Sequence, residues 1–68
     1  MVLIFGKENC PYTAAAVADY ERRNGEVTYF DVRRDPAQMD RMLEYSEGHR
    51  RVPVIVEDGK VTIGFGGT

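Results

Sequence analysis

Cys10 has the clearest chemical potential in this chain, because it is the only cysteine among the 68 residues. It begins the sequence Cys-Pro-Tyr-Thr, in which Thr13 stands where a Cys-x-x-Cys redox motif has its second cysteine. A thiolate at Cys10 is able to attack a disulfide, but the chain has no second thiol to release the bound partner. The motif therefore predicts one-sulfur chemistry, in which an external thiol completes each cycle.

The neighbours of Cys10 favour its ionised form. Pro11 and the alanines after it predict a helix over residues 11–24, which places Cys10 at the N-cap. The free N–H groups of the first helical turn then point toward the sulfur, and Lys7 adds a positive charge nearby. A quiet core cysteine is the opposite interpretation, but such residues usually lie in apolar runs, whereas polar Asn9 precedes this one. We expect a reactive, partly exposed thiol with a lowered pKa.

A second signal lies in the sequence Arg51-Val52-Pro53, just ahead of an apolar strand. Proline lacks the N–H that a sheet ladder needs, so it belongs at the start or edge of a strand. In the fold proposed below, this segment runs antiparallel beside the first strand, and its start lies next to Cys10. We expect the Val52–Pro53 bond to be cis, which turns the Val52 backbone toward an extended peptide.

The remaining segments predict the framework that positions these residues. The expected elements are strands at 2–5 and 27–32, helices at 11–24 and from Pro36 to Gly48, and a hairpin at 52–63 that turns at Asp58-Gly59. Asp35 and Gln38 have the spacing of a capping box. A strand–helix–strand start requires a parallel crossover, and the hairpin adds two antiparallel strands. The predicted fold class is α/β, in the order β-α-β-α-β-β, with a four-stranded mixed sheet and a helix on each face.

Four stretches of the chain, in this order, resemble glutaredoxins: KENCPYT, YFDVRRDP, MLEYSEGHRRVPVIV and DGKVTIGFGG. They cover essentially the whole chain, so the resemblance implies a single glutaredoxin-like domain of thioredoxin fold over residues 1–68. The chain is also similar to the bacterial UXX-star group of selenoproteins, whose active site reads selenocysteine-Pro-Tyr-Thr. Cys10 would then stand in place of the selenocysteine.

The resemblance implies roles for individual residues. Cys10 matches the nucleophile that takes up glutathione. Separately from the resemblance, Pro11 and Thr13 are candidates for support of its thiolate, because they lie in the first turn of the predicted helix. From the residues alone, Thr13 either donates a hydrogen bond to the thiolate or is merely tolerated. The implied glutathione contacts are Lys7 and Arg51 at its carboxylates, Tyr12 lining the groove, Val52 pairing through its backbone, and Pro53 as the cis proline.

Several other side chains receive simpler interpretations. Tyr20, Tyr29 and Phe30 are interpreted as core residues. Arg33 and Arg34 follow the second strand at the Cys10 end of the sheet, where they would broaden a positive field that attracts anionic glutathione.

The C-terminal end departs from the glutaredoxin pattern. Glutaredoxins usually continue after the double glycine with an Asp-containing turn and a third helix, whereas this sequence reads GFGGT at 64–68. The departure predicts a truncated or missing final helix, an uncovered sheet face and, as its consequence, a weak homodimer.

Composition and charge argue against several classes of function. The formal net charge of -2 argues against general nucleic-acid binding, and the apolar run at 2–5 is too short to span a membrane. One cysteine and one histidine fall short of a structural metal site. A lone thiol fits a reducing compartment, so a cytoplasmic location is expected.

Three functions are compatible with this pattern. The favoured one is a monothiol oxidoreductase that uses Cys10, with glutathione as co-substrate, on glutathionylated or disulfide-containing proteins. The first alternative is a glutathione-dependent 2Fe–2S cluster-binding module, in which two chains and two glutathiones supply the four thiolates. The second is a redox-sensing thiol protein.

Overall fold

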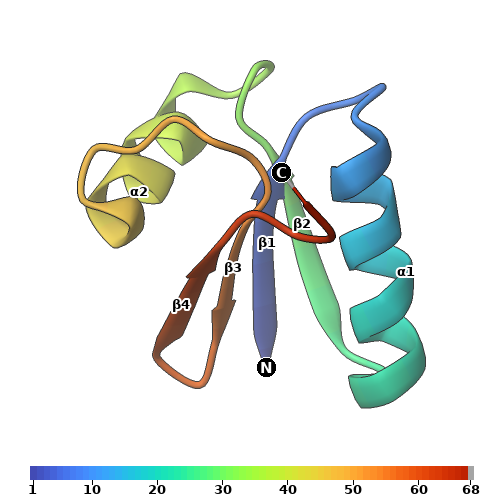
Figure 1. Cartoon of the computed structure of the whole chain (residues 1–68). Helices are drawn as coiled ribbons and strands as arrows, with labels where there is room; N and C mark the ends of the chain where they lie inside the picture. Colours follow the sequence, from blue (N-terminus) through green and yellow to red (C-terminus); the bar gives the residue numbers. More distant parts are fainter. Residues whose placement is uncertain (68) are drawn as a thin grey trace.

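The computed structural model describes residues 1–67, which form one mixed sheet with two helices (Figure 1). The elements in chain order are β1 (Val2–Gly6), α1 (Pro11–Asn24), β2 (Val27–Asp31), α2 (Pro36–Ser46), β3 (Val54–Glu57) and β4 (Lys60–Ile63). This order confirms the predicted β-α-β-α-β-β arrangement. Within the described range, neither helix is both long enough and apolar enough to cross a membrane.

The sheet has the strand order β2-β1-β3-β4, with β1 in an interior position. β1 pairs in parallel with β2, and the β1–β3 and β3–β4 pairs are antiparallel. The hairpin turn between β3 and β4 has positive φ at both Asp58 and Gly59, as the Asp-Gly signal predicts. The predicted four-stranded mixed sheet is therefore confirmed.

The two helices cover opposite faces of the sheet, and each face has its own apolar cluster (Figure 1). Adjacent residues of a strand point to opposite faces, so Phe5 packs toward α2 whereas Ile4 packs toward α1. The cluster under α2 consists of Phe5, Val32, Met42, Val54 and Val56, and that under α1 of Val2, Ile4, Ala16 and Ile55. The uninterrupted apolar sequence of β1 is thus explained by burial on both sides.

The ends of the helices follow from local chemistry. Cys10 is the N-cap of α1, and Gly25 ends that helix in the left-handed conformation, with φ 76°. Asp35 caps α2 by accepting a hydrogen bond of 3.1 Å from the Ala37 N–H. The predicted capping box is only half formed, because the Gln38 side chain accepts from Arg41 instead. The helix also ends earlier than predicted, since Glu47 already adopts the left-handed C-cap conformation.

The C-terminal segment closes the face that sequence analysis left uncovered. Phe65 packs against the cluster under α1, with its ring centroid 6.4 Å from that of Tyr20. Val2, Ile4 and Ile55 are consequently no more than 1% exposed. The prediction of an uncovered face was wrong for β1 and β3, whereas the weak homodimer stays a prediction.

We predict that Phe65→Ala lowers the free energy of unfolding by about 2 kcal/mol, because a partly buried aromatic side chain leaves the α1 cluster. Binding of a dye specific for exposed apolar surface should rise at the same time. Urea unfolding measures the first effect. Val61→Ala, at an exposed position of β4, is the matched control and should change stability by less than about 0.5 kcal/mol. Equal effects of the two substitutions would contradict the proposed role of Phe65.

Candidate active site

Cys10 lies where the loop after β1 turns into α1. Asn9 has a positive φ of 60°, which reverses the chain direction, and Cys10 then returns to an extended conformation. The first helical hydrogen bond runs from the Ala14 N–H to the Cys10 carbonyl, at 3.0 Å. The thiol is free and partly exposed. An N-cap with a sulfur side chain therefore stands at the positive end of the helix dipole.

The pKa of Cys10 is lowered from its ordinary value, as expected. The largest cause is the Thr13 hydroxyl, and partial burial of the sulfur opposes it. The backbone N–H groups of Thr13 and Tyr12 lower the pKa further, and the charge of Lys7 adds a smaller contribution. All four favourable influences stabilise a negative sulfur. This direction agrees with a hydrogen bond from Thr13 to the thiolate, which stays a prediction.

The Thr13 hydroxyl is itself an unusual group. Thr13 is 3% exposed, and its Oγ1 makes no well-aligned hydrogen bond within the described residues. A buried donor without a partner is costly, and an ionised Cys10 sulfur gives this hydroxyl the acceptor that it lacks. The Thr13 hydroxyl therefore favours the thiolate form of Cys10, and the thiolate in turn favours burial of the hydroxyl.

Gly6 is a site residue that sequence reasoning missed. A Cβ atom built on Gly6 would lie 2.3 Å from Thr13 Cγ2 and 2.6 Å from Thr13 Oγ1, which no real side chain tolerates. The absence of a side chain at the end of β1 lets Thr13 approach the backbone and sit beneath Cys10. A glycine within an apolar strand was the available signal, since it often marks such a close approach.

The sequence around Pro53 lies beside the active-site loop. Phe5 pairs with Val54, so the start of β3 meets the end of β1, from which the Cys10 loop departs. The Val52–Pro53 peptide bond is cis, as predicted. The Pro53 carbonyl accepts a hydrogen bond of 2.7 Å from the Gly64 N–H, and a Cβ on Gly66 would lie 3.9 Å from the Tyr12 ring. The glycine-rich C-terminus therefore runs between the Pro53 segment and Tyr12.

A cleft of about 760 Å³ opens beside Cys10 on the β2 side of the loop. We call it the α1–β2 cleft. Its lining residues are Lys7, Glu8, Asn9, Cys10, Pro11, Thr13, Ala14, Val17, Ala18, Glu21 and Tyr29. Tyr29 is 39% exposed, so its prediction as a core residue was wrong. Burial of part of the ring raises the pKa of Tyr29, with the negative charges of Asp31 and Glu8 as smaller causes.

The predicted site residues therefore fall into separate groups. Lys7, Cys10, Pro11 and Thr13 share the α1–β2 cleft. Arg51 lies in a different hollow with His49, Arg50 and Ile63, and its guanidinium makes no ion pair within residues 1–67. Tyr12, Val52 and Pro53 line neither hollow. In the described part of the chain, no cluster of three or more Cys, His, Asp or Glu side chains could hold a metal ion.

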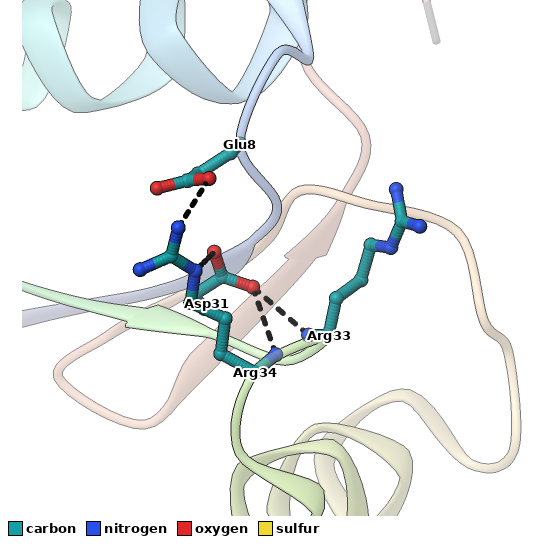
Figure 2. A network of polar contacts seen from close by, with 4 residues as sticks. All are labelled: Glu8, Asp31, Arg33 and Arg34. Atoms are coloured by element: carbon teal, nitrogen blue, oxygen red, sulfur yellow. Dashed lines mark hydrogen bonds and ion pairs between the residues drawn. The ribbon is translucent and has the colours of Figure 1, made fainter.

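A polar network ties the active-site loop to the turn after β2 (Figure 2). Arg34 Nη2 lies 2.8 Å from Glu8 Oε2, and Asp31 Oδ1 accepts from the backbone N–H groups of Arg33 and Arg34. The charge of Arg34 is therefore balanced locally and adds less to a positive field than expected. Figure 2 shows the Arg33 guanidinium directed away from this network.

We predict that Thr13→Val raises the Cys10 pKa, because the largest stabilising influence on the thiolate is removed. Thiolate reacts and thiol does not, so the midpoint of iodoacetamide alkylation against pH should move upward. Between the two midpoints the variant should react more slowly, and well above both the rates should agree. Thr13→Ser retains the hydroxyl and should keep a midpoint close to that of wild type. An unchanged midpoint in Thr13→Val would contradict the assignment.

Comparisons with known proteins agree with this geometry. The "thioredoxin-like protein BC3987" superposes with a TM-score of 0.83 at 27% identity, over 97% of this chain and 89% of that one. A mutant of the same protein gives the same score and identity over 88% of its own chain. The glutaredoxin grx-1 from Archaeoglobus fulgidus superposes with a TM-score of 0.78 at 21% identity, over 96% of this chain and 75% of that one, and shows the same fold.

No curated protein sequence matches the chain. The family model for glutaredoxin, in contrast, matches residues 2–62, which include the cysteine loop, the cis proline and all four strands apart from the last residue of β4. The chain therefore belongs to the glutaredoxin family.

Proposed function

We propose that the protein is a monothiol oxidoreductase that acts on glutathione mixed disulfides through Cys10. The observation that carries this proposal is the lowered Cys10 pKa, whose largest cause is a threonine at the position of a resolving cysteine. Thr13 activates the first sulfur without supplying a second one. The glutaredoxin family assignment supports a redox function of this kind.

The proposed cycle has two exchange steps. In the first, the Cys10 thiolate attacks the glutathione sulfur of a mixed disulfide, forms a new S–S bond and releases the substrate thiolate, which takes a proton from water. In the second, the thiolate of a free glutathione attacks the glutathione sulfur on Cys10. The products are oxidised glutathione and the Cys10 thiolate, so one glutathione is consumed for each substrate reduced.

Glutathione would approach from the side of the cis proline. The Arg51 guanidinium is exposed and unpaired within residues 1–67, which leaves it available to a carboxylate. Lys7 contributes positive charge near the sulfur. In this proposal Tyr12 lines the groove, Val52 pairs with the glutathione backbone, and Pro53 holds the loop in its turned conformation.

The alternatives use the same thiolate. Cluster binding would join two chains through Cys10, and redox sensing would need only a stable adduct. We place the protein in a reducing compartment such as the cytoplasm, on the ground that its single reactive thiol has no resolving partner.

We predict that wild-type protein incubated with oxidised glutathione gains the mass of one glutathione and keeps it until an external thiol is added. Thr13→Cys places a sulfur next to Cys10 on the first turn, so the adduct should convert into an internal disulfide. Mass spectrometry should then show a loss of two hydrogens and no retained glutathione. A folded wild-type protein that forms no adduct would refute the oxidoreductase and leave cluster binding, which anaerobic reconstitution and visible absorbance would detect.

We also predict that Arg51→Glu slows glutathionylation by oxidised glutathione by about tenfold or more, because attraction becomes repulsion at a charge-assisted contact. Reaction with an uncharged small disulfide should change little. Arg50→Glu makes the same charge change one residue earlier and is the matched control. Equal slowing by the two substitutions would indicate a general field effect and not a carboxylate contact at Arg51.

A further inference from the structure

The α1–β2 cleft shares Cys10 with the glutathione side but lies across the loop from it. β1 separates β2 from β3 in the sheet, so the residues ahead of β3 and the cleft beside β2 reach the sulfur from different directions. Arg51, Val52 and Pro53 do not line the cleft. Glutathione held in the manner proposed above would therefore meet the cleft only at its sulfur end, where Lys7 and Cys10 line it, and would leave the length along α1 free.

Along one face of α1 the cleft is lined by small apolar side chains, with Glu21 at the far end. Pro11, Ala14, Ala18 and Glu21 follow the three- and four-residue spacing of a single helix face, opposite Tyr29 of β2. From Cys10 to Glu21 this face is roughly 16 Å long, at about 1.5 Å per residue. An extended peptide of about five residues has the same length. The cleft is thus long enough for a short polypeptide segment.

The two ends of the cleft differ in charge. At the sulfur end, Lys7 is positive and Glu8 is already paired with Arg34 at 2.8 Å. At the far end, the carboxylate of Glu21 makes no ion pair within residues 1–67. Glutathione is a poor occupant of the far end, because it has no apolar side chain to match the walls and Glu21 repels its negative charge. An apolar segment followed by a basic residue is complementary to both the walls and the far end.

A buried polar group also faces this space. Thr13 lines the cleft at its Cys10 end, and its hydroxyl has no well-aligned partner within residues 1–67. The thiolate satisfies that donor in the free enzyme. Once Cys10 forms a mixed disulfide its sulfur is neutral. The Thr13 hydroxyl then loses the thiolate as its acceptor, at the Cys10 end of the α1–β2 cleft.

We propose that the α1–β2 cleft binds the polypeptide of the substrate, namely apolar residues next to its glutathionylated cysteine and a Lys or Arg about four residues away. The inference rests on the proposed function for its chemistry. Attack on the glutathione sulfur expels the substrate cysteine as a thiolate, and the chain that bears this cysteine lies along α1. The cleft therefore selects which proteins are deglutathionylated, whereas the cis-proline side recognises glutathione.

Binding is tested first, without any reaction. Cys10→Ser protein is titrated with peptides in which serine replaces the reacting cysteine, followed or preceded by two leucines and a lysine. Amide resonances of Ala14, Ala18 and Tyr29 should shift, and a peptide with glutamate in place of lysine should bind at least threefold more weakly. Shifts at these residues caused by free glutathione, or by protein concentration alone, would overturn the proposal, since glutathione or a second copy would then occupy the cleft.

Turnover provides the second test, with two kinds of substrate. One is the glutathionylated leucine–lysine peptide, and the other is the mixed disulfide of glutathione with 2-mercaptoethanol, which has nothing to place in the cleft. Ala18→Leu fills the cleft, and the ratio of kcat/KM for peptide over small substrate should fall about tenfold. Ala15→Leu adds the same side chain at an exposed position outside the cleft and should leave the ratio unchanged.

The two tests separate the inference from the function beneath it. If the small mixed disulfide is not reduced, the proposed function fails, and the peptide titration still decides whether the cleft binds. If the small substrate is reduced but Ala18→Leu and Ala15→Leu give the same ratio, the cleft has no part in substrate selection and the inference is overturned.

Discussion

Strand β1 lies between β2 and β3, and its neighbouring residues Ile4 and Phe5 are fully buried on opposite faces of the sheet. β1 contributes apolar side chains to both faces of the sheet, and the cluster under each helix is built around them. The Phe5 ring stacks on Phe30, with centroids 5.1 Å apart, and fixes β1 to its parallel partner. The loop that leaves this rigid strand carries Cys10, so the position of the sulfur is set by the best-packed part of the molecule.

The chemistry of the site depends on close approach as well as on charge. Gly6 lets Thr13 pack against the backbone of β1. The buried hydroxyl of Thr13 is in turn the largest cause of the lowered Cys10 pKa. The N–H groups at the start of α1 add their dipoles, which need no reorganisation when the thiolate forms. In the proposed function, a threonine at this position supports the thiolate and does not resolve a mixed disulfide.

The two hollows described above differ in the charge of their side chains. Arg51, which makes no ion pair within residues 1–67, precedes the cis proline, whereas Glu21, likewise without an ion pair in that range, lies at the far end of the α1–β2 cleft. The Arg34–Glu8 ion pair neutralises the charge of Glu8 in the active-site loop and ties this loop to the β2–α2 turn (Figure 2). Anionic glutathione and a basic polypeptide would therefore be drawn to different sides of one reacting atom.

The amino-acid sequence by itself determined the order of the elements, the N-cap position of Cys10 and the cis peptide bond before Pro53. The first two features depend on local signals, namely Pro and Gly at helix ends, apolar runs in strands and an Asp-Gly turn, whereas the cis bond was expected from the place of Pro53 in the predicted sheet. Tertiary structure decided the rest. Phe65 packs on the cluster under α1, on the face that was expected to be uncovered, and Tyr29 lies at a cleft and not in the core. The Thr13 hydroxyl is buried only in the folded chain, where Thr13 packs against Gly6 and its Oγ1 has no well-aligned hydrogen-bond partner within residues 1–67. Side chains distant in sequence come into contact only when the strands pair. Local sequence patterns do not predict which of these side chains share a buried contact.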